Sequence, residues 1–296
     1  MKPLLFAMPG NQPMADQLGK MLSCEMGELQ VHQFPDGESS LRFLSNVAGR
    51  DIGIVCTLDR PDEKILALYL AANIARELGT SRIGLLVPYL PYMRQDARFK
   101  EGEGITSAHF ARLLSSCCNW LITVDPHLHR YHDLKEIYQV PTMVVRSASA
   151  ISAWILQNVE RPFVIGPDAE SEQWVAEVAR GARCPYTVLQ KIRHGDRYVE
   201  VSLPQAVQLL GMTPVLVDDI VSTARTMIAA TLHLHAAGLV SPVCIAVHAL
   251  FAGDAYAALQ AAGVARIVSC NTVAHPSNQI DLCNALAVSL QEFITL

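Results

Sequence analysis

Short apolar runs alternate with longer segments of helical period along almost the whole chain. The runs are rich in Val, Ile and Leu and show little polar–apolar alternation, which is typical of strands buried on both faces of a sheet. They predict strands at residues 4–8, 53–58, 83–87, 120–124, 163–165, 187–190, 215–217, 243–248 and 267–271. The segments between them predict helices at residues 11–24, 62–78, 106–116, 148–158, 170–180, 223–237 and 255–262. This alternation indicates an α/β fold with mostly parallel central sheets.

Individual residues support several of these helix boundaries. Pro61 stands directly before an Asp-Glu pair, and a proline followed by acidic residues is a favourable helix start. Gly79 and Gly238 follow the last periodic residues of two predicted helices, where a glycine commonly ends a helix.

The strand–helix pattern runs twice, which predicts two domains. The first series ends near Pro141, and the second begins at about residue 146 and continues to about residue 271. We therefore expect domains at residues 1–145 and 146–296. Residues 281–296 predict a terminal helix, which could pack on either domain.

Composition narrows the class of protein. The 296 residues carry a formal net charge of −5, and 51% of them are hydrophobic, which excludes a disordered chain. The acidic balance argues against a nucleic-acid-binding surface or a polybasic membrane anchor. No apolar stretch reaches the ~18 residues of a membrane span. The eight cysteines are scattered without a C-x-x-C pair, so we expect reduced core thiols in a cytoplasmic protein.

The clearest chemical signal is at residues 213–231. An apolar strand leads into Asp218 and Asp219, a loop with the hydroxyls of Ser222 and Thr223 follows, and Thr226 lies where a helix begins. Hydroxyls and amides at a helix N-terminus can cradle a phosphate, and the carboxylates beside it suit sugar hydroxyls or Mg²⁺. The alternative is an acidic turn with a Ser/Thr cap. The motif is not a Walker sequence, because the glycine–lysine pair is missing.

A cationic loop follows the strand at residues 83–87. Arg94, Arg98 and Lys100 gather there in an otherwise lightly charged chain. Guanidinium groups bind phosphate bidentately, so the cluster suits a polyphosphate, although a solvated charged loop explains it equally well.

A second basic cluster spans residues 191–198. It fits a hairpin with His-Gly-Asp at the turn, which would bring Lys191 and Arg193 near a loop tip. Such cations can stabilise the charge that develops during phosphoryl transfer. Taken alone, the motif fits an ordinary exposed hairpin better.

Three histidines follow the strand at residues 120–124. His127, His129 and His132 raise the possibility of a zinc hydrolase, but no matching carboxylate or thiolate motif stands out. A single histidine that takes part in a Mg²⁺ site is better supported.

Five segments and one basic pair occur in a fixed order. They are Phe34-Pro-Asp36-Gly37-Glu38, Pro-Tyr-Leu-Pro-Tyr-Met-Arg94-Gln95-Asp96, Asp125-Pro-His127, Gly166-Pro-Asp168, Lys191-x-Arg193 and Val217-Asp218-Asp219-Ile-Val-Ser222-Thr223-Ala-Arg-Thr226. Through these segments nearly the whole chain resembles the ribose-phosphate pyrophosphokinases, also called phosphoribosyl pyrophosphate synthetases.

The resemblance implies two phosphoribosyltransferase-like domains and a reaction. The β,γ-diphosphoryl group of ATP would pass to the 1-hydroxyl of ribose 5-phosphate, with Mg²⁺ as cofactor. Because members of the family are oligomeric, the resemblance also implies a homo-oligomer, and it implies neither a nucleic-acid nor a membrane partner.

The resemblance also implies roles for individual residues. Lys191 and Arg193 would belong to a catalytic loop, and His127 and Asp168 would lie at the Mg²⁺ site. ATP contacts would come from Phe34, Asp36, Glu38, Arg94, Gln95, Asp96 and His127. Ribose 5-phosphate contacts would come from Asp218, Asp219, Ser222, Thr223, Ala224, Arg225 and Thr226.

The chain departs from the family pattern at Arg225, where a glycine is usual, at the Ala-Glu-Ser-Glu that follows Asp168, and at the Asp-Pro that precedes His127. Two alternatives to an active synthetase therefore stay open. One is a non-catalytic paralogue that binds nucleotide and regulates. The other is a phosphoribosyltransferase, since that class uses the same acid–acid phosphate loop.

Overall fold

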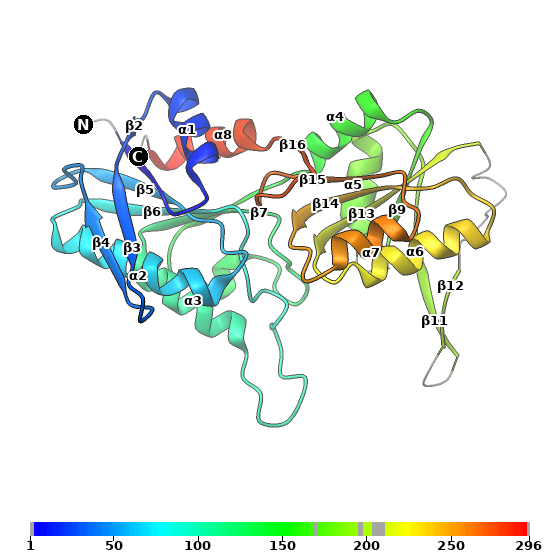
Figure 1. Ribbon diagram of the computed structural model, residues 1–296, viewed down its shortest axis with the longest axis horizontal. Coiled ribbons are helices and arrows are strands. Elements are labelled where there is room, and N and C mark those ends of the chain that lie inside the picture. Colours follow the sequence, from blue (N-terminus) through cyan, green and yellow to red (C-terminus); the bar gives the residue numbers. More distant parts are fainter. Residues whose placement is uncertain (1–2, 168–170, 195–197, 203–210, 295–296) are drawn as a thin grey trace. The chain divides into compact units, whose positions relative to one another are not determined.

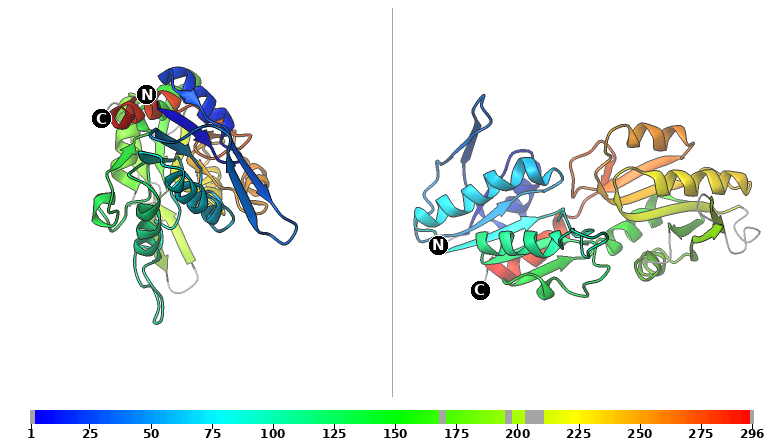
Figure 2. Two further views of the ribbon diagram at one scale, coloured as in Figure 1. Left: turned by 90° about the vertical axis from the view of Figure 1, so that its left-hand side faces the viewer. Right: turned by 90° about the horizontal axis from the view of Figure 1, so that it is seen from below.

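The computed structural model describes residues 3–167, 171–194, 198–202 and 211–294. The chain forms two compact units, of which the first is Met1–Val145 together with Cys283–Leu296 and the second is Arg146–Leu282. Figures 1 and 2 show the elements of each unit.

The first unit is built on a six-stranded parallel sheet in the order β2-β1-β5-β6-β7-β8. Its strands are β1 (Leu4–Ala7), β2 (Glu25–Met26), β5 (Asp51–Val55), β6 (Arg82–Val87), β7 (Trp120–Val124) and β8 (Thr142–Val145). Its helices are α1 (Gln12–Leu22), α2 (Pro61–Glu77), α3 (Thr106–Cys117) and α8 (Cys283–Ile294), with a short 3₁₀ turn at Leu134–Glu136. Helices α1 and α8 pack together on one face of the sheet, and α2 and α3 cover the other (Figure 1).

The second unit repeats this plan with a parallel sheet in the order β10-β9-β13-β14-β15-β16. Its strands are β9 (Pro162–Gly166), β10 (Tyr186–Val188), β13 (Thr213–Val221), β14 (Val243–Ala249), β15 (Arg266–Cys270) and β16 (Asn278–Ile280). Its helices are α4 (Ala148–Asn158), α5 (Glu172–Gly181), α6 (Arg225–Ala236) and α7 (Ala255–Ala261).

Each unit carries a hairpin at the same point of its topology. β3 (Leu29–Gln33) and β4 (Ser39–Phe43) pair antiparallel between β2 and β5 in chain order, and β11 (Gln190–His194) and β12 (Tyr198–Ser202) do so between β10 and β13. Figure 2 shows the β3–β4 hairpin standing away from its sheet. The chain is therefore a structural duplication in which strands, hairpins and crossover helices recur in the same order.

The predicted α/β class with parallel sheets is confirmed, and all the predicted helices and strands are present within a few residues of their expected bounds. The elements that the hydrophobic pattern does not predict are short edge strands and hairpin strands. β2 and β16 contain only 2 and 3 residues, too few for a period to show. β3 and β4 alternate polar and apolar residues, because only one side of the hairpin packs on the core.

Helix ends follow the sequence signals. Pro61 is the first residue of α2, with Asp62 and Glu63 in the first turn. Gly79 and Gly238 have φ values of +86° and +74°, and each donates its N–H to a carbonyl of the last helical turn. In both cases the following residue donates to a carbonyl one residue earlier in the helix, which completes a Schellman motif.

A tryptophan wedge fixes the packing of the first sheet against α8. Trp120 in β7 lies over Gly84 of the neighbouring strand, and a Cβ built on Gly84 would come within 1.8 Å of the indole. The indole also stacks on Phe293 of α8, with the two ring centroids 4.9 Å apart and an interplanar angle of 14°. The glycine in β6 thus makes room for the ring that holds the terminal helix on the first unit.

Two further properties concern the cysteines and the lengths of the helices. All eight cysteines lie among the described residues as free thiols, and six of them are buried. Burial raises the pKa of Cys56, Cys118 and Cys244 to about 12, so these thiols are unreactive core side chains. Within the described part of the chain, no helix is long and apolar enough to span a bilayer.

We expect Gly84→Ala to lower the free energy of unfolding by about 3 kcal/mol, because the added methyl group would overlap the buried indole of Trp120. The measurement is urea unfolding followed by tryptophan fluorescence. Gly104→Ala is the matched control, since its Cβ would meet only His109 at 3.8 Å, and its stability should stay within about 0.5 kcal/mol of the wild type. Equal destabilisation of both variants would contradict the role of the wedge.

Candidate active site

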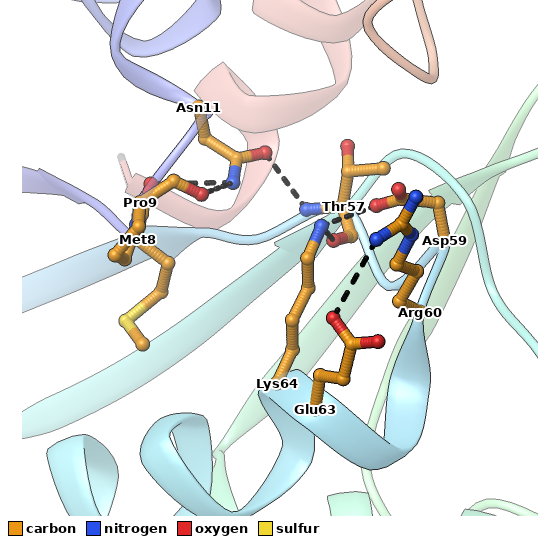
Figure 3. A network of polar contacts seen from close by, with 8 residues as sticks. All are labelled: Met8, Pro9, Asn11, Thr57, Asp59, Arg60, Glu63 and Lys64. Atoms are coloured by element: carbon orange, nitrogen blue, oxygen red, sulfur yellow. Dashed lines mark hydrogen bonds and ion pairs between the residues drawn. The ribbon is translucent and has the colours of Figure 1, made fainter. Parts of the chain in front are cut away.

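The loops that carry the predicted chemistry in the first unit follow the carboxyl ends of neighbouring parallel strands. Two further loops, after β1 and β5, leave from the same edge of the sheet and are joined by Asn11, which is 5% exposed. Its amide group donates to the carbonyls of Met8 and Pro9 at 3.2 and 3.1 Å, and its Oδ1 accepts the N–H of Thr57 at 2.8 Å (Figure 3). A buried side chain thus ties the end of β1 to the end of β5.

Lys64 connects this hydrogen-bond network to α2. Lys64 Nζ donates to the carbonyl of Thr57 at 3.0 Å and forms a short ion pair with Asp59 (Figure 3). The neighbouring Arg60 and Glu63 form only a long, solvent-exposed pair at 3.9 Å. Lys64 is therefore occupied in holding the loop after β5 on the first turns of α2.

The loop after β6 is held against α2 by Tyr92. Its backbone is left-handed, with φ of +63°, and its hydroxyl donates a short hydrogen bond to Asp62. That hydrogen bond, followed by burial, raises the pKa of Tyr92 to about 12. The main chain adds a bond from the N–H of Leu58 to the carbonyl of Tyr89 at 3.3 Å. These two bonds hold the first residues of the cationic loop against α2 and the loop after β5.

Arg94 and Gln95 are exposed, whereas the next residue, Asp96, is buried at 6% exposure. The main chain of Gln95 forms two hydrogen bonds. Its N–H donates to the carbonyl of Tyr92, and its carbonyl accepts from the N–H of Ser107. The Asp96 carboxylate accepts from Arg130 in the loop after β7. Of the three predicted ATP-contacting residues in this segment, Arg94 and Gln95 are thus exposed on a loop that is anchored on both sides, whereas Asp96 is buried and bonded to Arg130.

His127 lies in the loop after β7 and is half-buried. Just before it, Asp125 has φ of +28° and donates its N–H to the carbonyl of Val145 at 3.0 Å, which fixes the turn out of the strand. The rings of His127 and His129 lie nearly parallel, with centroids 6.3 Å apart. Among the described residues, no three His, Cys, Asp or Glu side chains lie together in a way that could hold a metal ion.

Phe34, Asp36 and Glu38 occupy the exposed turn of the β3–β4 hairpin. The N–H of Phe34 donates to the carbonyl of Glu38 at 2.7 Å, and Asp36 Oδ1 accepts the N–H of Glu38 at 3.1 Å. The Phe34 ring is 44% exposed and meets His32 edge-on at 4.8 Å. Asp36 therefore shapes the turn, and the Phe34 ring is presented to solvent.

In the second unit the acid pair lies inside β13 rather than after it. The strand continues to Val221, four residues beyond the predicted end. Asp219 donates its N–H to Asp218 Oδ1 at 3.0 Å, and Ile220 donates to Asp219 Oδ1 at 2.7 Å. Both carboxylates are half-buried next to the following amide. Pairing with β14 extends the strand past residue 217, because it supplies backbone partners that periodicity does not reveal.

The loop at residues 222–226, which we call the phosphate loop, leads into the N-terminus of α6. Ala224 has φ of +57° and precedes the first helical residue, Arg225, so the helix begins two residues later than predicted. Ala224 forms no side-chain cap at the start of α6, and the first amides of a helix without such a cap are suited to bind an anion. Thr223, Arg225 and Thr226 are exposed, Ser222 is half-buried, and Ala224 is buried.

The loop after β14 holds the start of the phosphate loop through main-chain bonds. The N–H groups of Leu250 and Phe251 both donate to the carbonyl of Val221 at 3.0 Å, and the N–H of Ala252 donates to Ser222 at 3.0 Å. These bonds fix the backbone before Thr223 without using its side chain.

The remaining predicted residues belong to the second unit. Asp168 lies outside the described residues. Gly166 just before it ends β9 in a crowded position, where a Cβ would come within 2.5 Å of Ser171 Oγ. The predicted hairpin at residues 191–198 is confirmed as β11–β12, in which Lys191 and Arg193 are paired with Val201 and Val199. The side chains of this hairpin lie outside the description.

Sequence reasoning missed the residues that hold these loops in place. Asn11, Asp62 and Arg130 act on partners 46, 30 and 34 residues away. No local pattern marks such a pair, because each partner is an ordinary loop or helix residue in its own segment. The structure joins neighbouring loops within each unit: those after β1, β5, β6 and β7 in the first, and those after β13 and β14 in the second.

Comparison with known proteins gives the family. Residues 3–117 match the N-terminal domain of ribose phosphate pyrophosphokinase, and residues 133–282 match the phosphoribosyl transferase domain. A ribose-phosphate pyrophosphokinase of Saccharolobus solfataricus is 32% identical over 93% of this chain and 96% of its own length. One from Methanopyrus kandleri is 30% identical over 93% and 94%.

A solved structure supports the fold. Phosphoribosylpyrophosphate synthetase from Mycobacterium smegmatis superposes with a TM-score of 0.87 at 21% identity, over 100% of this chain and 99% of that one. With the family match along both halves and the parallel-sheet duplication, the chain belongs to the ribose-phosphate pyrophosphokinase family.

Proposed function

We propose that this protein transfers the β,γ-diphosphoryl group of ATP to the 1-hydroxyl of ribose 5-phosphate, giving phosphoribosyl pyrophosphate and AMP. The observation that carries the proposal is the phosphate loop, which follows the strand that holds the acid pair and turns through a left-handed residue into the N-terminus of α6. The family assignment supplies the reaction, and the loops described above supply the parts that it needs.

Ribose 5-phosphate fits the second unit. Its phosphate would accept hydrogen bonds from the first amides of α6 and from the hydroxyls of Ser222, Thr223 and Thr226, with Ala224 at the turn of the loop and Arg225 adding a positive charge. Asp218 and Asp219 lie near the carboxyl end of β13, the strand that leads into this loop, so their carboxylates would serve the ribose hydroxyls.

ATP fits the exposed groups of the first unit. The Phe34 ring offers an aromatic surface for the base, with Asp36 and Glu38 in the same hairpin turn. Arg94 and Gln95 point outward from the loop that Asp96 anchors, so they can bind polar groups of the nucleotide.

Magnesium fits the proposed site through the chemistry of its donors. Mg²⁺ is usually held by one or two carboxylates together with substrate phosphates and water, so it does not need a cluster of three protein ligands. Asp168 would supply a carboxylate, and half-buried His127 would contact the ion's water shell. When bound, the ion neutralises negative charge on the transferring phosphates.

The chemical step exchanges one phosphorus–oxygen bond for another. The O1 oxygen of ribose 5-phosphate bonds to the β-phosphorus, and the bond from that phosphorus to the α,β-bridging oxygen breaks. The bridging oxygen leaves as part of AMP, and the proton of the 1-hydroxyl passes to water. Lys191 and Arg193 lie on β11, and we propose that they stabilise the charge that develops on the transferring group.

The two alternatives explain less of the structure. A phosphoribosyltransferase accounts for the second unit but leaves the hairpin and the cationic loop of the first unit without a role. A regulatory paralogue would not require Lys191 and Arg193 together with the phosphate loop. We further propose a cytoplasmic homo-oligomer that binds neither nucleic acid nor membrane, in keeping with the buried, reduced thiols and the acidic net charge.

The first test is an assay with ribose 5-phosphate, Mg²⁺ and ATP that follows AMP and phosphoribosyl pyrophosphate together. We expect the two products to appear in equal amounts. ADP formation in place of AMP would indicate transfer of a single phosphoryl group and contradict the proposal. ATP binding without either product would favour the regulatory alternative.

Lys191→Ala should lower kcat by about 100- to 1,000-fold, while the KM for ATP changes less than about threefold, because the charge acts mainly on the transition state. Lys135→Ala, which removes a lysine with a 71% exposed side chain, is the control and should keep full turnover. An unchanged kcat for Lys191→Ala would remove Lys191 from the mechanism.

Arg225→Ala should raise the KM for ribose 5-phosphate by about 10-fold, since a hydrogen bond to a charged group contributes about 1.5 kcal/mol. Arg225→Lys should recover part of this loss because it keeps the charge without the planar fork. Steady-state kinetics at constant ionic strength provides the measurement. A lower KM for Arg225→Ala would show instead that the arginine obstructs the loop.

A further inference from the structure

An ion pair between Arg130 and Asp96 joins the loops after β7 and β6, which carry His127 and Arg94. Arg130 Nη1 lies 2.8 Å from Asp96 Oδ1, and the main-chain N–H of Arg130 donates to Asp96 Oδ2 at 3.3 Å. The Asp96 side chain is only 3% exposed, whereas that of Arg130 is 47% exposed. Both carboxylate oxygens are therefore engaged by one residue of the neighbouring loop.

The guanidinium of Arg130 also reaches a second point of the cationic loop. Its central carbon lies 5.4 Å from the centroid of the Phe99 ring, a distance at which a cation and an aromatic face attract each other. Further along, Glu103 Oε2 accepts the N–H groups of Phe99 and Lys100, both at 2.9 Å. Arg130 thus contacts the cationic loop at Asp96 and at Phe99, on either side of Arg98. The following part of the loop is held by the hydrogen bonds from Phe99 and Lys100 to Glu103.

These contacts point to a positioning role. Asp96 follows Arg94 and Gln95 directly, so its position sets the direction in which those exposed side chains leave the loop. On the other side of the pair, Arg130 is three residues from His127. A charge-assisted bond with an almost fully buried acceptor is stronger and better defined in direction than a solvent-exposed pair.

We propose that Arg130 is a positioning residue, which sets the ATP-binding geometry of Arg94 and Gln95 by holding Asp96 and does not itself bind the nucleotide. This inference rests on the proposed function, because it takes ATP as the ligand of that loop. A structural pair elsewhere in the unit provides the comparison: Arg82 and Asp51 lie 3.8 Å apart at the amino ends of β6 and β5, and both are partly exposed.

The test uses the full chain and titrates it with Mg-ATP by calorimetry. We expect Arg130→Met and Asp96→Asn each to raise the ATP dissociation constant by about 10- to 100-fold, as misplacement of a binding loop by about 1 Å does. In the assay the KM for ATP should rise in parallel, with kcat and the KM for ribose 5-phosphate within about threefold of the wild type. Arg82→Met, the matched control, should leave ATP binding unchanged.

Hydrogen exchange gives a readout that does not depend on a ligand. In the ligand-free protein, amides 94–104 should exchange faster in Arg130→Met than in the wild type, and the β3–β4 hairpin should not change. If Arg130→Met fails to fold because a carboxylate is left buried and unpaired, the double variant Asp96→Asn/Arg130→Met removes that charge. The double variant should fold and still bind ATP weakly.

Several outcomes would overturn the proposal. Wild-type ATP affinity in Arg130→Met would do so, and so would unchanged exchange in the loop. Retained affinity in Asp96→Asn combined with lost affinity in Arg130→Met would show that Arg130 binds the nucleotide directly. ATP binding by the wild type without product formation would overturn only the proposed function, whereas failure of the wild type to bind Mg-ATP would overturn both.

Discussion

Parallel strand pairing is the constraint on which the rest of this structure depends. A parallel neighbour can be reached only by a crossover, so each strand enters its sheet from the same edge and leaves it at the opposite one. Every loop with proposed chemistry in the two sheets, after β6 and β7 in the first unit and after β9 and β13 in the second, leaves from that carboxyl edge. Hydrogen bonding within the sheet therefore gathers residues that lie far apart in the sequence.

In the proposed function, the duplicated plan would serve two kinds of ligand. The phosphate loop follows β13, and the equivalent loop of the first unit follows β5. Asn11 and Lys64 form hydrogen bonds with the main chain of Thr57 in that loop. The hairpins likewise recur at one topological position, with an aromatic ring exposed at the turn in the first unit and a lysine and an arginine in the sequence of the second. In the proposed function, the same scaffold would thus carry the nucleotide contacts in one unit and the sugar-phosphate contacts in the other.

Within a loop, buried side chains anchor the main chain, and exposed side chains are the ones proposed to bind ligands. Buried Asn11 and Asp96 use their polar atoms on the protein itself, and the exposed Arg94 lies two residues before Asp96 in the loop that Asp96 anchors. The backbone fixes the phosphate loop in the same way, because Ala252 donates to Ser222 without occupying the hydroxyls nearby. Anchoring groups and proposed ligand-binding groups are therefore neighbours in sequence but face different surroundings.

The sequence by itself determined the fold class, the helices, the central strands and the segments that carry the chemistry. Val-Ile-Leu runs, Pro61 and the glycines at positions 79 and 238 act locally, so their effects can be predicted from neighbouring residues. The tertiary structure alone decided the two-residue edge strand β2, the extension of β13 to Val221, the packing of α8 on the first unit and the pairing of Arg130 with Asp96. Each of these depends on a partner tens of residues away in the chain, and such partners become neighbours only when the sheets form.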